Sequence, residues 1–130
     1  MSETEPIQFS PRRGSAGANN GSSFHQSAIP STVFFTRVEL SAILDLYGRM
    51  VAAGHWRDYA IELGHAAAVF AAFRRTAERP EFRIEKRPDL RNRQGMWALI
   101  AEHGQVVKRG HELGPVLAPI ERRLMKLIED

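Results

Sequence analysis

Cysteine is absent from the 130 residues of this sequence. Its absence excludes disulfides, thiolate metal sites and a cysteine nucleophile, and it fits a reducing compartment. Long apolar runs are missing too, because none approaches the roughly 18 residues of a membrane-spanning helix. We therefore expect a cytoplasmic protein without membrane contact.

Catalytic signatures are also missing. The chain has no GxSxG, P-loop, strand-linked GxGxxG or HExxH, and no two of its five histidines stand at i, i+4. We therefore predict no catalytic residue, no cofactor and no metal site. An enzyme with an unrecognised site stays an alternative, because small folds can host unrelated activities.

Lysine is scarce. The basic residues are 15 arginines and only three lysines, and the formal net charge is +3. Arginine forms bidentate hydrogen bonds with phosphate and carboxylate groups, so the excess of arginine is compatible with an anionic partner. The alternative is the codon usage of a GC-rich genome, in which arginine, alanine, glycine and proline rise together.

The first 31 residues differ in composition from the rest. They are rich in Ser, Gly, Asn and Pro and show no period of 2 or 3.6. Such a segment cannot bury enough apolar area to offset the entropy of ordering. We predict a disordered tail over residues 1–31 and a single domain over residues 32–130.

A clear helix start follows the tail. Thr36 and Glu39 form a capping box, in which each side chain reaches the other's backbone N–H. Gly54 supplies the left-handed residue that ends a helix. We predict a helix from Arg37 to Ala53. Its buried stripe is expected to contain Leu40, Ile43, Leu44, Tyr47 and Val51.

After this helix the apolar period changes to 2, which is typical of strands. Short strands are predicted at residues 59–63, 69–73, 82–85, 96–101 and 105–109. A second amphipathic helix closes the chain. Pro115 suits its first position, but Pro119 does not suit a helix interior. The second helix therefore either starts near Pro119 or bends in its first turn.

This order of elements predicts a fold. Consecutive strands joined by short turns favour an antiparallel meander, and two amphipathic helices need a common surface to cover. We predict a two-layer α+β domain, with an antiparallel meander of four or five strands and both helices on one face.

The densest polar stretch is LYGRMVAAGHWRDYAIELGH, residues 46–65. The predicted elements divide its polar side chains between a helix, a turn and opposite strand faces, whereas catalysis needs convergent groups. We interpret the stretch as a structural junction. The alternative is that His55 and Asp58 meet across the turn.

Four segments together resemble a small alphaproteobacterial family catalogued only as a domain of unknown function. They are VFFTRVEL, LYGRMVAAGHWRDYAIEL, AVFAAFRRTAERPEFRIEKRPDLRNRQGMWALI and VVKRGHEL. The resemblance covers about residue 33 to the end of the chain. It implies a bacterial, cytoplasmic protein and brings no activity, cofactor or catalytic residue.

The segment from residue 74 to 93 is strongly basic. It holds eight basic and four acidic residues, a net charge of 8 − 4 = +4. Two loops beside one strand would present it as a patch for phosphates, so RNA or DNA binding is a candidate function. Interleaved acids and the lack of a stacking aromatic count against it. The candidate contacts are Arg74, Arg75, Arg79, Arg83, Lys86, Arg87, Arg91 and Arg93.

The sheet face away from the helices is the leading candidate for function. If Val69 and Phe73 face the helices, then Ala68, Phe70 and Ala72 face outward, and one register adds Trp97 and Leu99. An outward face that is apolar in its middle predicts an interface. We therefore expect a non-enzymatic interaction domain that self-associates or binds a partner protein through Phe70, Trp97 and Leu99. The alternative places Trp97 in the core.

Overall fold

The computed structural model describes residues 32–76 and 78–129, so the predicted tail over residues 1–31 lies outside the described residues. The elements are α1 (Arg37–Ala52), β1 (Asp58–Leu63), β2 (Ala68–Phe73), β3 (Phe82–Lys86), the 3₁₀-helix η2 (Pro88–Leu90), β4 (Trp97–Ala101), β5 (Val106–Gly110) and α2 (Leu113–Glu129). Within these described ranges, no helix combines the length and the apolar character needed to cross a bilayer.

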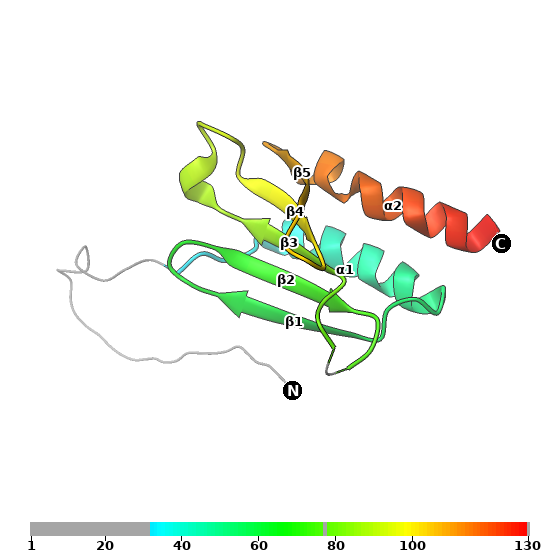
Figure 1. Cartoon of the computed structure of the whole chain (residues 1–130). Coiled ribbons are helices and arrows are strands. Elements are labelled where there is room, and N and C mark those ends of the chain that lie inside the picture. Colours follow the sequence, from blue (N-terminus) through cyan, green and yellow to red (C-terminus); the bar gives the residue numbers. More distant parts are fainter. Residues whose placement is uncertain (1–31, 77, 130) are drawn as a thin grey trace. The chain divides into compact units, whose positions relative to one another are not determined.

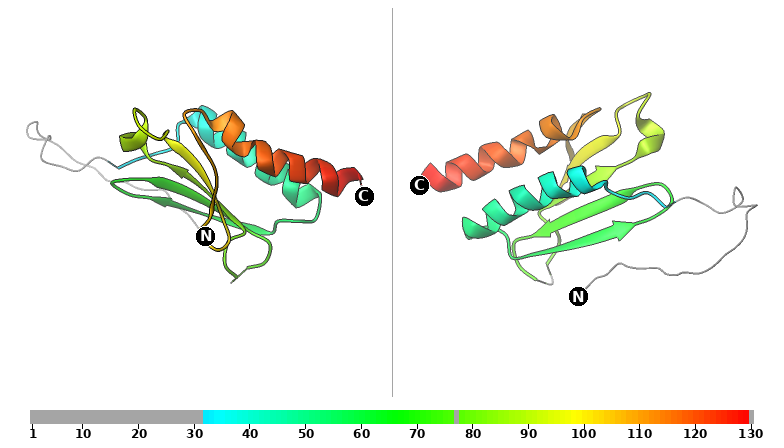
Figure 2. Two further views of the ribbon diagram at one scale, coloured as in Figure 1. Left: turned by 45° about the horizontal axis from the view of Figure 1, so that its top comes forward. Right: turned by 180° about the vertical axis from the view of Figure 1, so that it is seen from behind.

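The strands form one antiparallel sheet in the order β1-β2-β3-β4-β5, which is a meander (Figure 1). Both helices lie on the same face of this sheet, as the two further views make plain (Figure 2). The predicted two-layer α+β fold is confirmed. The opposite face carries no layer of secondary structure from the described residues.

Helix α1 begins where the capping box predicts. The Thr36 N–H donates to Glu39 Oε1 at 2.8 Å, and the Glu39 N–H donates to Thr36 Oγ1 at 3.2 Å. Gly54, with φ of 79°, follows its end. The buried stripe differs in part from the expected one, because it runs through Ile43, Leu46 and Met50, while Val51 is exposed.

The cap leads to a stability prediction. Thr36→Ala removes the acceptor for the Glu39 N–H and is expected to lower the free energy of unfolding by about 1 kcal/mol. Urea unfolding followed by circular dichroism measures the change. Thr36→Ser keeps the hydroxyl and serves as the control, and an equal loss in both variants would contradict a capping role.

The side chains of β2 occupy the opposite sheet faces to the predicted ones, so that Ala68, Phe70 and Ala72 face the helices. Phe70 pairs with Ile84 of β3, Ile84 pairs with Leu99 of β4, and Trp97 lies on the same face. All four belong to the hydrophobic core beneath the helices, and Phe70 is only 1% exposed. The predicted outward placement of Phe70, Trp97 and Leu99 is therefore wrong.

The physical reason is the sequence of β2, AVFAAF. Each face of this strand receives one phenylalanine and small residues, so the apolar pattern hardly distinguishes the two phases. A one-residue slip in phase transfers every side chain to the other face. Tyr47 of α1 decides the outcome, since its ring meets the Phe70 ring edge-on with centroids 6.0 Å apart.

Helix α2 begins at Leu113, before both prolines. Pro115 stands in the first turn, where a backbone N–H has no intrahelical acceptor. Pro119 lies inside the helix and removes one hydrogen bond there. The helix tolerates this loss because four apolar side chains on one face of it are buried: Val116, Leu117, Ile120 and Leu124.

Candidate functional site

The turn between α1 and β1 meets the start of β3 at a carboxylate. Glu81 lies with both carboxylate oxygens near His55 Nε2, at 3.0 and 3.1 Å. Trp56 Nε1 donates to Glu81 Oε1 at 2.7 Å, and Arg123 of α2 lies 3.1 Å from Oε2. The His55 and Glu81 side chains are 9% and 11% exposed. We call these four residues the Glu81 cluster.

The cluster answers the question that the sequence left open at residues 46–65. His55 meets Glu81 and not Asp58, whose Oδ1 accepts the N–H of Tyr59 at 2.8 Å. A general base must aim a free lone pair at a substrate proton. Three donors, from His55, Trp56 and Arg123, already contact Glu81. Glu81 therefore has a structural role, because it connects the turn, the start of β3 and α2.

Tyr47 contributes to the same region from α1. Its ring stacks with the Trp56 ring at 5.9 Å and meets the Tyr59 ring edge-on at 5.0 Å. Burial raises the pKa of the Tyr47 hydroxyl above its usual value of 10.0, and the negative charge of Asp58 raises it further. The hydroxyl is therefore neutral at physiological pH and serves as a packed core group.

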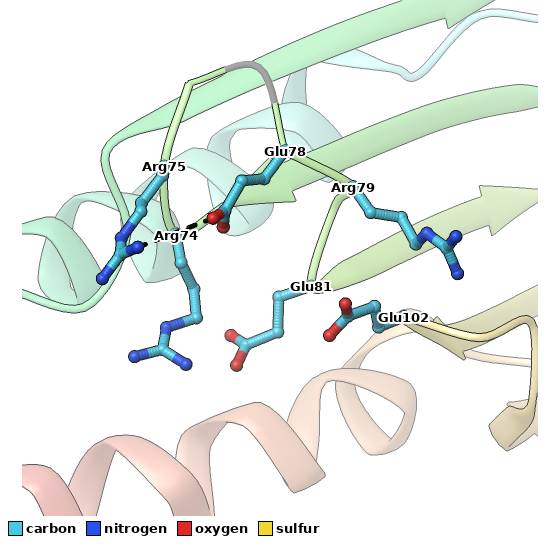
Figure 3. Close-up of a pocket in the computed structure, with 6 residues that line it drawn as sticks. All are labelled: Arg74, Arg75, Glu78, Arg79, Glu81 and Glu102. Carbon is cyan, nitrogen blue, oxygen red and sulfur yellow. Dashed lines mark ion pairs between the residues drawn. The ribbon is translucent and has the colours of Figure 1, made fainter.

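A polar cavity of about 220 Å³ adjoins the cluster at the β2–β3 loop (Figure 3). It is lined by Arg74, Arg75, Glu78, Arg79, Glu81 and Glu102. Arg75 pairs with Glu78 at 3.6 Å. With three arginines against three glutamates, the lining has no net charge and favours neither an anion nor a cation. In the part of the chain that the structure describes, no three His, Cys, Asp or Glu side chains converge on a potential metal position.

The eight predicted nucleic-acid contacts are not one patch. Arg74, Arg75 and Arg79 precede β3, whereas Arg91 and Arg93 follow it. The five residues of β3, at about 3.3 Å each, hold the two groups some 15 Å apart. The basic segment is thus divided between opposite ends of the sheet.

One member of the predicted set faces the wrong way. Lys86 lies on the helix face, donates to Phe34 O and to Glu39 Oε1 at 2.7 Å each, and sits over the Trp97 ring. Its side chain is 10% exposed. The prediction that Lys86 belongs to an exposed basic patch is therefore wrong, because the start of α1 needs this cation for its own contacts.

The outer face of the sheet carries Arg83 of β3 and Arg109 of β5, and Arg87 follows directly after β3. Arg83 Nη2 and Arg87 Nε pair with Glu85 at 3.4 and 3.2 Å. Arg109 pairs in register with Ala98, and its Nη1 is buried without a hydrogen-bond partner among the described residues. The apolar residues of this face are at most 9% exposed at its centre: Ala71, Ala98 and Ile100. Neighbouring side chains already cover them.

Strand β1 lies at one edge of the sheet and is exposed along most of its length. The residues Tyr59 to Leu63 are all exposed, and among the described residues the strand pairs only with β2 (Figure 1). Tyr59, Ile61 and Leu63 share the helix face with Phe70, yet they are 43%, 38% and 44% exposed. The helices do not reach far enough to cover this edge.

The backbone of β1 also turns polar groups away from β2. The N–H of Gly64 donates to the carbonyl of Ala67 at 3.0 Å, so Gly64 and Ala67 form a hydrogen-bonded pair of the β1–β2 ladder. Counting back from Gly64 shows which residues of β1 turn their backbone groups toward β2. In an antiparallel pair, every second residue turns its N–H and C=O away from the neighbour. For β1 these are Tyr59, Ile61 and Leu63, so apolar side chains and backbone groups that turn away from β2 coincide on the same residues. The outward N–H of Tyr59 donates to Asp58 Oδ1.

A second apolar feature lies between the last turns of the two helices. It is a groove of about 510 Å³ lined by Ala52, Ala53, Leu124, Met125 and Ile128, with Arg49 and Glu121 at its rim. Met125 and Ile128 are exposed. No described contact indicates what covers this groove.

Together, the meander, the two covering helices and the bare outer face define a small two-layer α+β domain. The chain belongs to the family DUF2794, described as a protein of unknown function, whose family model matches residues 33–117. This match ends inside α2, earlier than the resemblance in the sequence implied. No curated protein and no solved structure matches the chain.

Proposed function

We propose that the domain is a non-enzymatic protein-interaction module that self-associates or binds a partner protein by adding a strand to the free edge of β1. One observation supports this most directly. Tyr59, Ile61 and Leu63 present both half-exposed apolar side chains and outward backbone groups. An added strand satisfies the backbone groups and covers the side chains at once.

The contrast with the other edge of the sheet strengthens the proposal. Proteins blunt edge strands with lysine, proline, bulges or a covering element, because a bare edge recruits other chains. Strand β5 has an irregular register with β4 near Ile100, carries Lys108 and Arg109, and packs against α2. Strand β1, DYAIEL, has none of these devices within the described residues. The outer sheet face stays a second predicted interface, but its central apolar residues expose little area.

Crosslinking in cells tests the proposal. A benzophenone amino acid in place of Ile61 is expected to crosslink to protein in living cells of the source organism, because the edge is occupied there. The same amino acid in place of Val38, which is exposed on α1, is the control. Equal crosslinking from both positions, or none from position 61, would rule out the edge as the interface.

Nucleic-acid binding through the basic segment is a second candidate. Arg83 and Arg109 on the outer face lie between the arginines that precede β3 and those that follow it, and Arg87 stands just after the strand. This arrangement offers a phosphate backbone a track across the sheet. Glu85 weakens it by pairing with Arg83 and Arg87.

Binding to a labelled RNA or DNA is expected to fall steeply with salt, because each phosphate contact releases counterions. Reversal of Arg75, Arg79 and Arg91 to Glu should abolish it. Reversal of Arg37, Arg57 and Arg122 to Glu changes the net charge equally at other exposed positions and should retain most of the binding. Absence of binding at about 50 mM salt would remove this candidate.

A further inference from the structure

We infer that the strand added to β1 is β1 of a second copy, paired antiparallel with Ile61 opposite Ile61 across a two-fold axis. The inference rests on the proposed function, since it names the partner of the same edge. The paired copies would form one continuous sheet of two five-stranded halves, with all four helices on one face. A two-fold interface of this kind uses the same surface of both chains and closes on itself.

Backbone geometry restricts the register. Only residues whose N–H and C=O turn outward can exchange hydrogen bonds across the new edge, so Tyr59, Ile61 and Leu63 must face one another. With Ile61 on the axis, Tyr59 faces Leu63 of the second copy and every outward residue has a partner. With Ala60 on the axis, Tyr59 faces Ile61 and Leu63 has no partner within the strand. The first register uses the edge completely.

Charge selects the same register. With Ala60 on the axis, Asp58 faces Glu62 of the second copy, and the two-fold axis repeats this contact. Like charges directly opposite on a sheet are destabilising. With Ile61 on the axis, Glu62 faces Ala60, and no two acids of β1 stand opposite each other. The carboxylates then remain free to contact water on the outer face.

Side-chain packing agrees with this choice. On the helix face, Ile61 meets Ile61 and Tyr59 meets Leu63, so all three half-exposed residues of each copy gain an apolar neighbour. Tyr59 is already held on one side by its stack with Phe70, with centroids 5.1 Å apart. Only the N–H of Tyr59 must change partner, since Asp58 Oδ1 now accepts it.

Cysteine crosslinking of the full chain tests the register, because the protein has no cysteine of its own. Ile61→Cys places two thiols opposite each other at a Cα separation of about 5.5 Å, which a disulfide spans. Under mild oxidation it is expected to form a covalent dimer about a hundredfold faster than Val38→Cys, a collision control on α1, because association raises the effective thiol concentration. Ala60→Cys should behave like the control, and preferential crosslinking of Ala60→Cys would overturn the proposed register.

Light scattering on the purified full chain tests the partner. The expected mass is that of two chains, and Ile61→Lys should halve it while the circular dichroism spectrum stays unchanged. Val38→Lys is the matched control and should remain dimeric. A native protein with the mass of one chain at every concentration overturns the second copy as partner.

The benzophenone at position 61 separates this failure from failure of the proposed function. Isotope mixing and mass spectrometry identify what it captures, and the expected product joins β1 of two copies. Capture of a different protein, or of residues 1–31, overturns the second copy while the edge remains a binding site. Absence of any capture overturns both.

Discussion

Phe70→Glu is expected to leave the chain unfolded at room temperature. Phe70 is 1% exposed and lies against the rings of Tyr47 and Tyr59. Loss of a core phenylalanine costs about 3–5 kcal/mol, and a buried carboxylate without a partner adds several more. Domains of this kind are stable by only about 5–15 kcal/mol, so the two losses together exceed most of the available stability.

Ala71→Glu is the matched control. It places the same side chain one residue further along β2, on the outer face and directly opposite Arg83. This variant is expected to stay folded, with a change in the free energy of unfolding of about 1 kcal/mol or less. Circular dichroism and thermal unfolding of both variants show which substitution unfolds the protein, and therefore which of the two side chains faces the core. If Ala71→Glu unfolds while Phe70→Glu does not, the strand has the opposite phase.

The second large effect is expected at the Glu81 cluster. Glu81→Ala removes the hydrogen-bond partner of Trp56 Nε1 and His55 Nε2 and the charge partner of Arg123. Trp56 is 2% exposed and the His55 side chain 9%, so both groups lose the carboxylate in a largely buried site. We expect a loss of about 2–4 kcal/mol in the free energy of unfolding, below the range for a fully buried pair because Arg123 stays half-exposed.

Glu81→Gln separates the contributions within the cluster. The amide oxygen can still accept from Trp56, so this variant is expected to lose less than Glu81→Ala. Glu102→Ala removes a carboxylate from the same cavity, but Glu102 is exposed and should change the urea midpoint little. Equal effects of Glu81→Ala and Glu102→Ala would contradict the role of the cluster as a tie between three elements.

Local features were predictable because their partners are close in sequence. The capping box joins residues three apart, and Gly54 ends the helix through its own backbone conformation. The strands follow from a change of period and from short polar turns. The meander then follows because neighbouring strands joined by short turns pair with each other. None of these inferences needed knowledge of a distant contact.

The candidate site was less predictable, because its contacts span long stretches of chain. Glu81 lies 26 residues from His55 and Lys86 lies 47 residues from Glu39. A lone glutamate in a basic loop gives no signal that it will accept from a tryptophan. A period-2 strand likewise predicts an apolar face, but not whether a helix is long enough to cover it, and the exposure of Ile61 therefore has no signal in the sequence.

By itself, the sequence determined the start of the first helix, the order of the helices and strands, and the two-layer class. These depend on local hydrogen bonding and on the spacing of apolar residues. Only the tertiary structure decided which phenylalanine of β2 is buried, that Lys86 turns inward and that the side chains of β1 stay exposed. Each of these depends on packing between residues that are remote in the chain.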